Sequence, residues 1–149
     1  MNTAAIIYKT KTANRKEVSG HLEKCKEAFT PPLDKKVNIA EYSKKIVENS
    51  VTFEAWANNE LVGLIAAYFN DKNNHTGFIT NVSLINEYSG KGIASGLLDN
   101  CIRFAKDKGF KEIKLEVNAA SLPAIKLYKK YHFTETASQG DTKTMRLAF

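Results

Sequence analysis

The sequence of 149 residues has few cysteines and no long hydrophobic run, and each shortage excludes a class of protein. Cys25 and Cys101 stand far apart and form neither a Cys-x-x-Cys pair nor a Cys/His cluster. This excludes a disulfide-rich secreted scaffold, and we expect both thiols to be reduced and structural. His21 and His132 have no acid or cysteine at metal-ligand spacing, so we expect no bound metal.

Several familiar sequence patterns are also missing. The N-terminal stretch MNTAAIIYKTKTANR has only a two-residue apolar run after its alanines. That run is too short for a secretory signal or a membrane span, so we expect a cytoplasmic protein without a membrane-bound segment. The pattern Gly-x-x-x-x-Gly-Lys-Ser/Thr of P-loop nucleotidases is absent, and so is the Gly-x-Ser-x-Gly of serine hydrolases.

Positive charge is in excess, with 22 basic and 16 acidic residues and a net charge of +6. Such an excess suits either nucleic acid or a small polyanionic cofactor. The basic residues are scattered, and none of them form a run interleaved with aromatic residues. The pattern therefore argues against nucleic acid, which stays as an alternative, and favours the small polyanion.

The hydrophobic pattern predicts one α+β domain over residues 1–149, because the length and the 43% share of hydrophobic residues suit a single core. Alternation or short apolar runs predict strands at residues 5–12, 51–57, 60–69, 77–85, 111–117, 131–136 and 142–149. Helical spacing predicts helices at residues 15–29, 39–49, 91–108 and 121–131. The order indicates an antiparallel meander followed by a single β-α-β unit.

The stretch EYSGKGIASGLL, residues 87–98, places Gly90 and Gly92 at the start of an amphipathic helix. Glycine allows a tight turn and close approach of a ligand, and the free N–H groups of a helix N-terminus suit a phosphate. A plain strand-to-helix turn explains the glycines equally well. The glycines also resemble the Gly-x-Gly-x-x-Gly fingerprint of dinucleotide-binding proteins, and Glu116 lies about where such a site has an acidic residue. However, Ser95 stands at the third glycine position, and the chain has no second β-α-β half.

Two blocks of sequence together resemble the GNAT superfamily of acyl-CoA-dependent N-acyltransferases. The family motif (Gln/Arg)-x-x-Gly-x-(Gly/Ala) falls on residues 89–94, and LEVNAASLPAIKLYKKYHF, residues 115–133, resembles the next motif. The predicted order of elements also matches the family. The chain departs from the motifs at Ser89, where Gln or Arg is usual, at Ser121 in place of Asn, and at His132 in place of Gly.

The resemblance implies a mixed, mostly antiparallel sheet of about seven strands with four helices, in which the fourth and fifth strands are parallel and splayed. It implies direct transfer of an acetyl group from acetyl-CoA to a primary amine of a small molecule or a peptide. The cofactor would be held by Val82, Ser83, Leu84, Gly90, Lys91, Gly92, Ile93, Ala94, Ser95 and Ser121.

Two catalytic roles follow from the resemblance. Tyr128 matches the tyrosine that protonates the departing thiolate, although without the family it reads as a core aromatic. Glu116 resembles a base in a Leu-Glu-Val element, and strand alternation places it opposite Leu115 and Val117; it could equally be a plain exposed residue. His75 is a weaker candidate for the base. We also expect Ser121 to cap the helix that follows it.

The sequence does not identify the acceptor amine. The resemblance assigns its recognition to residues 15–49 and to the loop near residues 137–142, and these carry no clear charge pattern. The sequence does not determine the oligomeric state, and an exposed sheet edge could pair with that of a second copy to form a homodimer. The alternative function is a non-catalytic module that binds CoA or nucleic acid.

Overall fold

The computed structural model describes residues 5–149. Residues 1–4, which begin the N-terminal stretch discussed above, lie outside the described residues. The described chain forms seven strands: β1 (Ile7–Thr10), β2 (Val51–Ala57), β3 (Glu60–Asp71), β4 (Thr76–Leu84), β5 (Glu112–Asn118), β6 (Thr134–Gln139) and β7 (Thr142–Ala148). Its α-helices are α1 (Arg15–Cys25), α2 (Leu33–Lys36), α3 (Ile39–Asn49), α4 (Ile93–Asp107) and α5 (Leu122–Lys130).

All seven strands form one mixed sheet with the order β1-β2-β3-β4-β5-β7-β6. Only β4 and β5 pair in parallel, and every other neighbouring pair is antiparallel. The predicted fold class is therefore confirmed. Asn58 and Asn59 form the turn between antiparallel β2 and β3, and both have positive φ (51° and 63°), as a two-residue hairpin turn requires.

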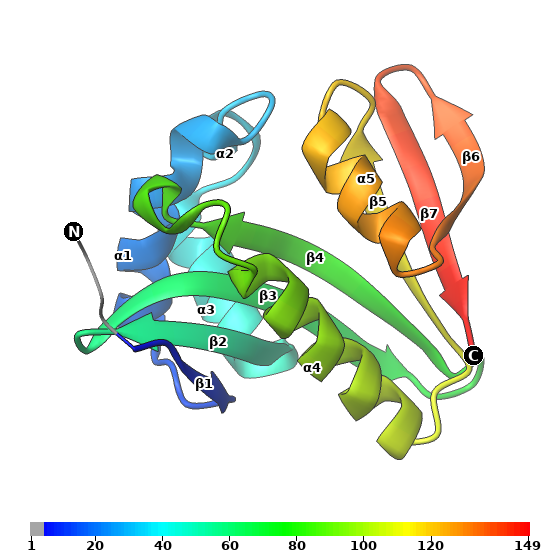
Figure 1. Cartoon of the computed structure of the whole chain (residues 1–149), viewed down its shortest axis with the longest axis horizontal. Coiled ribbons are helices and arrows are strands. Elements are labelled where there is room, and N and C mark those ends of the chain that lie inside the picture. Colours follow the sequence, from blue (N-terminus) through cyan, green and yellow to red (C-terminus); the bar gives the residue numbers. More distant parts are fainter. Residues whose placement is uncertain (1–4) are drawn as a thin grey trace.

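The helices lie on both faces of the sheet. In Figure 1, α4 and α5 lie in front of it, while α1 and α3 lie behind it. The helical spacing of apolar residues in α4 predicts one core-facing side, and there Ile93, Leu97, Leu98, Cys101 and Ala105 are buried while Ile102 is half-buried. Two hydrophobic clusters result, one around α4 and α5 and the other beneath α1 and α3.

The structure corrects the predicted number of helices and two predicted boundaries. Five α-helices replace the four predicted, because Leu33–Lys36 form one helical turn that is too short to show periodicity. The helix predicted to reach residue 29 ends at Cys25 and continues as a 3₁₀ turn, Lys26–Ala28. The strand predicted from residue 131 begins at Thr134, because the three preceding amides bond back to carbonyls of α5.

The parallel pair β4 and β5 is joined along only part of its length. Thr76 to Ile79 pair with Glu112 to Leu115, and pairing stops there. Beyond that point β4 follows β3 as far as Leu84, while β5 follows β7 as far as Asn118. The two halves of the sheet therefore diverge, as Figure 1 shows, which confirms the predicted splay.

Candidate active site

The gap between the diverging strands holds a cavity of about 240 Å³. Its walls are the ends of β4 and β5, the first turns of α5, and the chain between α1 and α2. Four of the predicted site residues line this one cavity: Val82, Glu116, Ser121 and Tyr128. Residues from four separate parts of the chain thus meet where the sheet opens.

The loop before α4 presents bare backbone amides. Gly90 and Gly92 both have left-handed φ (74° and 79°), a conformation that glycine adopts without the steric cost that a side chain brings. Gly92 is the N-cap of α4, and no side chain caps the helix. Within residues 5–149, the amides of residues 90–95 have no hydrogen-bond acceptor. A Cβ at either glycine would meet no atom within 4 Å, so this peptide face is open.

These features make the loop a suitable anion site. The first N–H groups of a helix lack intrahelical partners, and the helix dipole places positive charge there. Ile93 is buried and contributes only its backbone, while Lys91 is exposed. Tyr131 of α5 donates a hydrogen bond of 3.2 Å to the Ser95 carbonyl, which links α5 to the first turn of α4.

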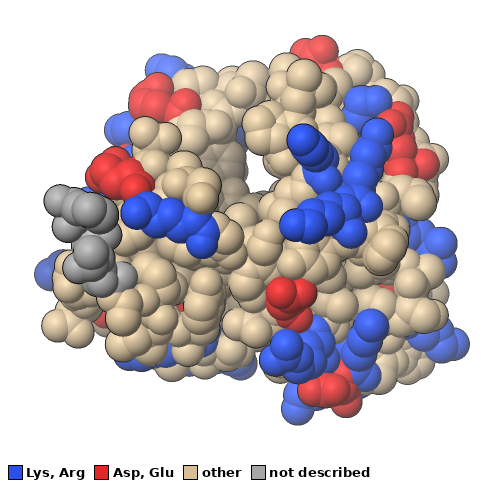
Figure 2. All heavy atoms as spheres, viewed as in Figure 1, with Lys and Arg blue, Asp and Glu red and all other residues tan. Residues whose placement is uncertain are grey.

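Positive charge surrounds this opening. Figure 2 shows the molecule hollowed between the two halves of the sheet, with Lys and Arg side chains gathered over α5 and beside the loop before α4. The sequence of α5 carries Lys126, Lys129 and Lys130, and the loop carries Lys91. A polyanion would therefore be attracted to this side of the molecule.

Tyr128 lies on α5 and lines the cavity. Its side chain is 5% exposed, and its ring packs against Phe133 with centroids 5.8 Å apart. Its hydroxyl forms no hydrogen bond to any residue in 5–149, and burial is the sole cause that shifts its pKa. Burial raises the pKa of Tyr128 to about 12, so the phenol keeps its proton at neutral pH.

Glu116 lies on β5 just beyond the last residue that pairs with β4. Leu115 is buried and Val117 half-buried in the cluster beside α5, whereas Glu116 is exposed, so its side chain leaves the opposite face of the sheet. Glu116 and Tyr128 thus reach the gap from opposite faces. His75 lies in the turn before β4, at the closed end of the strand pair, and does not line the cavity.

Ser121 occupies the N-cap position of α5, but its side chain forms no capping hydrogen bond. Its ψ of 66° departs from the extended geometry that aims a capping hydroxyl at the helix amides. Asn118 instead accepts a 2.8 Å bond from the Ala120 amide. The predicted N-cap position is therefore confirmed, but the expected capping hydrogen bond is absent, and Ser121 lines the cavity.

A buried polar chain behind β4 was not predicted. His21 of α1 is 3% exposed, and its Nδ1 lies 2.9 Å from the Leu61 carbonyl, which can only accept. Its Nε2 lies 2.8 Å from Ser83 Oγ, which in turn lies 2.8 Å from the side-chain oxygen of Asn81. Asn81 lines the cavity, so the chain connects α1 with the site through β4.

Burial lowers the pKa of His21 to about 4, so the imidazole is neutral at pH 7. The Ser83 side chain is occupied by His21 and Asn81 and does not line the cavity, which leaves only its backbone for a ligand. In the sequence His21 shares a helical stripe with Val18, Leu22 and Cys25, and such a pattern indicates only a core face.

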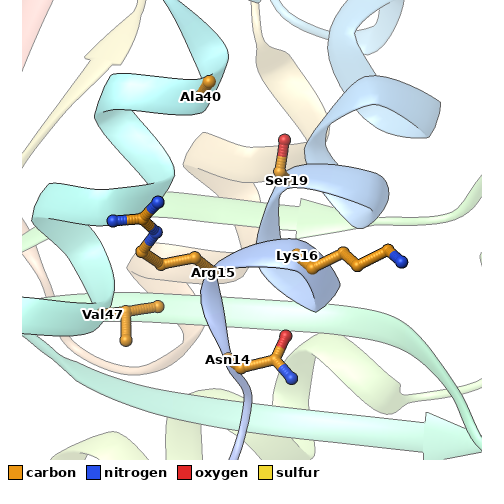
Figure 3. A pocket seen from close by; sticks show the side chains of 6 residues that line it. All are labelled: Asn14, Arg15, Lys16, Ser19, Ala40 and Val47. Carbon is orange, nitrogen blue, oxygen red and sulfur yellow. The ribbon is translucent and has the colours of Figure 1, made fainter.

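A second large cavity lies elsewhere, between α1 and α3, with a volume of about 560 Å³. Figure 3 shows Arg15 extended from α1 toward α3, near Val47, and Lys16 pointing away from it. Its six lining residues include no carboxylate and none of the predicted catalytic or cofactor-binding residues, although five of them lie within residues 15–49, where the resemblance places recognition of the acceptor. Nothing about this cavity indicates acid–base chemistry.

Residues 5–149 contain no group of three or more His, Cys, Asp or Glu side chains that could hold a metal ion. No helix in the same residues is long and apolar enough to cross a lipid bilayer.

Known proteins with similar sequences are acetyltransferases. An N-alpha-acetyltransferase of Saccharolobus solfataricus is 40% identical over 58 residues, which are 38% of this chain and 35% of that protein. Human N-acetyltransferase 8B is 36% identical over 55 residues, 37% of this chain and 24% of that protein. The matched segments thus span about a quarter to a third of these relatives.

Solved structures extend the likeness to the whole fold. The ribosomal-protein-S18-alanine N-acetyltransferase of Escherichia coli has a TM-score of 0.80 at 17% identity, covering 97% of this chain and 94% of that one. The PaiA N-acetyltransferase of Thermoplasma acidophilum, solved with coenzyme A, has a TM-score of 0.76 at 16% identity, covering 97% and 99%. The model of the acetyltransferase (GNAT) family matches residues 17–133, and the chain therefore belongs to that family.

Proposed function

We propose that this protein transfers an acetyl group from acetyl-CoA directly to a primary amine. One observation carries the proposal. The bare amides of residues 90–95 lie at the start of α4, which the Tyr131–Ser95 hydrogen bond joins to α5, and Tyr128 of α5 lines the cavity between β4 and β5. The first feature suits a diphosphate and the second a leaving group that needs a proton.

The residues present fit the elongated, polyanionic shape of acetyl-CoA. The amides of residues 90–95 would hold the pyrophosphate, with added charge from Lys91 and from the lysines of α5. The pantetheine arm would run along Val82, Ser83 and Leu84, where β4 has lost its β5 neighbour, and would bond to the strand as an extra strand does. The hydroxyl of Ser121 would face this arm. Ser89 is too short to replace a long polar side chain at the phosphates.

The chemistry of the thioester sets the demands on the protein. Acetyl-CoA supplies an acetyl group whose C–S bond breaks as a C–N bond to the amine forms, releasing the thiol of CoA and one proton. A backbone N–H near Leu84 would stabilise negative charge that develops on the carbonyl oxygen. Both substrates would meet in one cavity, so no covalent bond to the protein is needed.

Tyr128 would protonate the departing sulfur. A pKa of about 12 makes a free phenolate costly at neutral pH. Tyr128 would therefore take up a second proton as it gives its own to the sulfur. The attacking nitrogen must lose a proton as the C–N bond forms, and it would supply that second proton. Glu116 would accept the earlier proton from the ammonium form of the amine, directly or through a water.

Further expectations accompany this proposal. Cys25 and Cys101 are both buried and free, which suits a reducing compartment such as the cytoplasm. The exposed edges of the sheet are β1 and β6, and pairing through either edge would give the predicted homodimer. Both statements stay predictions.

The direct test is an acetyl-transfer assay with release of free thiol as the readout. The purified chain is mixed with acetyl-CoA and a panel of amines that spans amino acids, peptides, polyamines and amino sugars. We expect thiol release that depends on one class of amine, with mass spectrometry showing a gain of one acetyl group. Binding of acetyl-CoA without turnover of any amine would instead support the non-catalytic alternative.

A further inference from the structure

Two unpaired side chains of opposite charge stand at the mouth of the site. Lys36, at the end of α2, and Glu116, on β5, both line the 240 Å³ cavity. Both also line a neighbouring cavity of about 580 Å³ that opens outward between the α1–α2 connection and the β6–β7 turn. Lys36 and Glu116 therefore lie on the wall that the two cavities share.

Neither charge is used by the protein itself. Within residues 5–149 neither Lys36 nor Glu116 forms an ion pair, whereas other charged residues nearby do. Lys26 pairs with Glu23 and Asp34, and Lys143 pairs with Glu135. Lys36 is also the only cation among the described residues that line either cavity. A ligand entering here meets one free ammonium and one free carboxylate.

Resting on the proposed function, we infer that the acceptor is a primary amine that carries a carboxylate a few bonds away. The amine lies beside Glu116, which accepts its proton, and the carboxylate lies beside Lys36. Lys36 thereby acts as a specificity residue, and the acceptor is held in one orientation by opposite charges at its two ends. A free amino acid has this chemistry, and so does a peptide N-terminus followed by an acidic residue.

The charges disfavour polycationic acceptors. The inner cavity has Glu116 balanced by Lys36, and the outer one adds a single further carboxylate, Asp141. The whole chain carries a net charge of +6, which repels polycations from a distance. A polyamine or a multiply charged amino sugar would therefore meet Lys36 without a matching carboxylate of its own.

The test compares specificity ratios in the full-length protein. The ratio is kcat/KM for a carboxylate-bearing amine over kcat/KM for its carboxamide, so that differences in amine reactivity cancel between variants. Glycine and alanine are paired with their amides, and the peptide Ala-Glu-Ala with Ala-Gln-Ala amide; these two arms separate amino acid from peptide. The variants are Lys36→Glu and Lys36→Met. Lys35→Glu is the matched control, because Lys35 is exposed on the same helical turn and lines neither cavity.

We expect the ratio to fall about tenfold in Lys36→Glu and about threefold in Lys36→Met, as for a solvent-facing ion pair, and to stay within twofold in Lys35→Glu. Calorimetric binding of acetyl-CoA should be unchanged in all three. An unchanged ratio in Lys36→Glu, or spermidine as a better acceptor than every carboxylate-bearing amine, would overturn the inference and leave the acetyltransferase proposal standing. A wild-type protein that neither binds acetyl-CoA nor acetylates any amine would overturn the proposed function itself.

Discussion

Replacing Tyr128 by Phe separates a catalytic hydroxyl from a core aromatic. The ring and its packing on Phe133 are kept, and only one oxygen is lost. Because that oxygen has no hydrogen-bond partner within residues 5–149, its removal leaves no orphaned polar group behind. We therefore expect the free energy of unfolding to change by less than about 1 kcal/mol.

The expected effect on turnover is much larger. Loss of a positioned general acid lowers rates by about 10²–10⁴-fold, and even the lower limit corresponds to about 2.7 kcal/mol of transition-state stabilisation. The assay is steady-state thiol release from acetyl-CoA, with urea unfolding and acetyl-CoA calorimetry on the same preparation. In Tyr128→Phe we expect kcat to fall at least 100-fold, while the free energy of unfolding and the affinity for acetyl-CoA stay close to those of wild type.

A matched control is available in Tyr131→Phe. Tyr131 lies on the same helix end and does have a partner, the Ser95 carbonyl, but it does not line the cavity. We expect a small effect on kcat there. A Tyr128→Phe protein that keeps more than half of its kcat would refute the assignment of Tyr128 as the acid and return it to a packing role.

Two further predictions concern stability and pH. The pKa of His21 is lowered from 6.5 to about 4. Between these two pH values the unfolded chain therefore binds a proton at His21 that the folded chain does not. His21 alone should reduce the free energy of unfolding by about 3 kcal/mol as the pH falls from about 6.5 to 4. His21→Gln should remove this part of the slope in urea titrations. Burial favours the neutral form of Glu54, but hydrogen bonds from Thr12, Thr52, Ala13 and Trp56 outweigh it and hold its pKa below the usual value. Glu54→Gln should therefore cost about 1–3 kcal/mol at pH 7, a difference that shrinks as the pH falls through the lowered pKa.

Each of these has a clear contrary result. An identical pH slope in wild type and His21→Gln would mean that the imidazole is already charged or exposed in the folded chain. A Glu54→Gln protein as stable as wild type at pH 7 would mean that the carboxylate accepts none of these bonds in solution. Chemical unfolding followed by circular dichroism measures both.

Much of the fold was predictable because strong local patterns agree with the tertiary contacts. The stripe of α4 is apolar at every buried position, and the Asn58–Asn59 turn has residues that tolerate positive φ. The one-turn helix Leu33–Lys36 was missed because four residues cannot show a helical period. The splay of β4 from β5 leaves no mark in either strand's own sequence, and its prediction came from the family resemblance.

The site was predictable where backbone geometry makes it and less so where side chains do. Gly90 and Gly92 predict a tight turn before a helix, and in the structure both residues have left-handed φ just before α4. Ser121 stands at its expected position without the expected hydrogen bond, because its ψ depends on how α5 meets β5. His21 was missed because it meets Ser83 only after α1 packs across β4, a contact between residues 62 positions apart.

The central claim is that the open amides around Gly92 hold the diphosphate of CoA. The most direct measurement is calorimetric titration of acetyl-CoA into wild type, Gly92→Trp and Gly109→Trp. Gly92 and Gly109 lie at opposite ends of α4 with nearly equal φ (79° and 82°) and open space around both, so the backbone strain of the two variants is matched. We predict that binding is lost in Gly92→Trp and retained in Gly109→Trp. Equal affinity in both variants, or no binding by wild type, would contradict the claim.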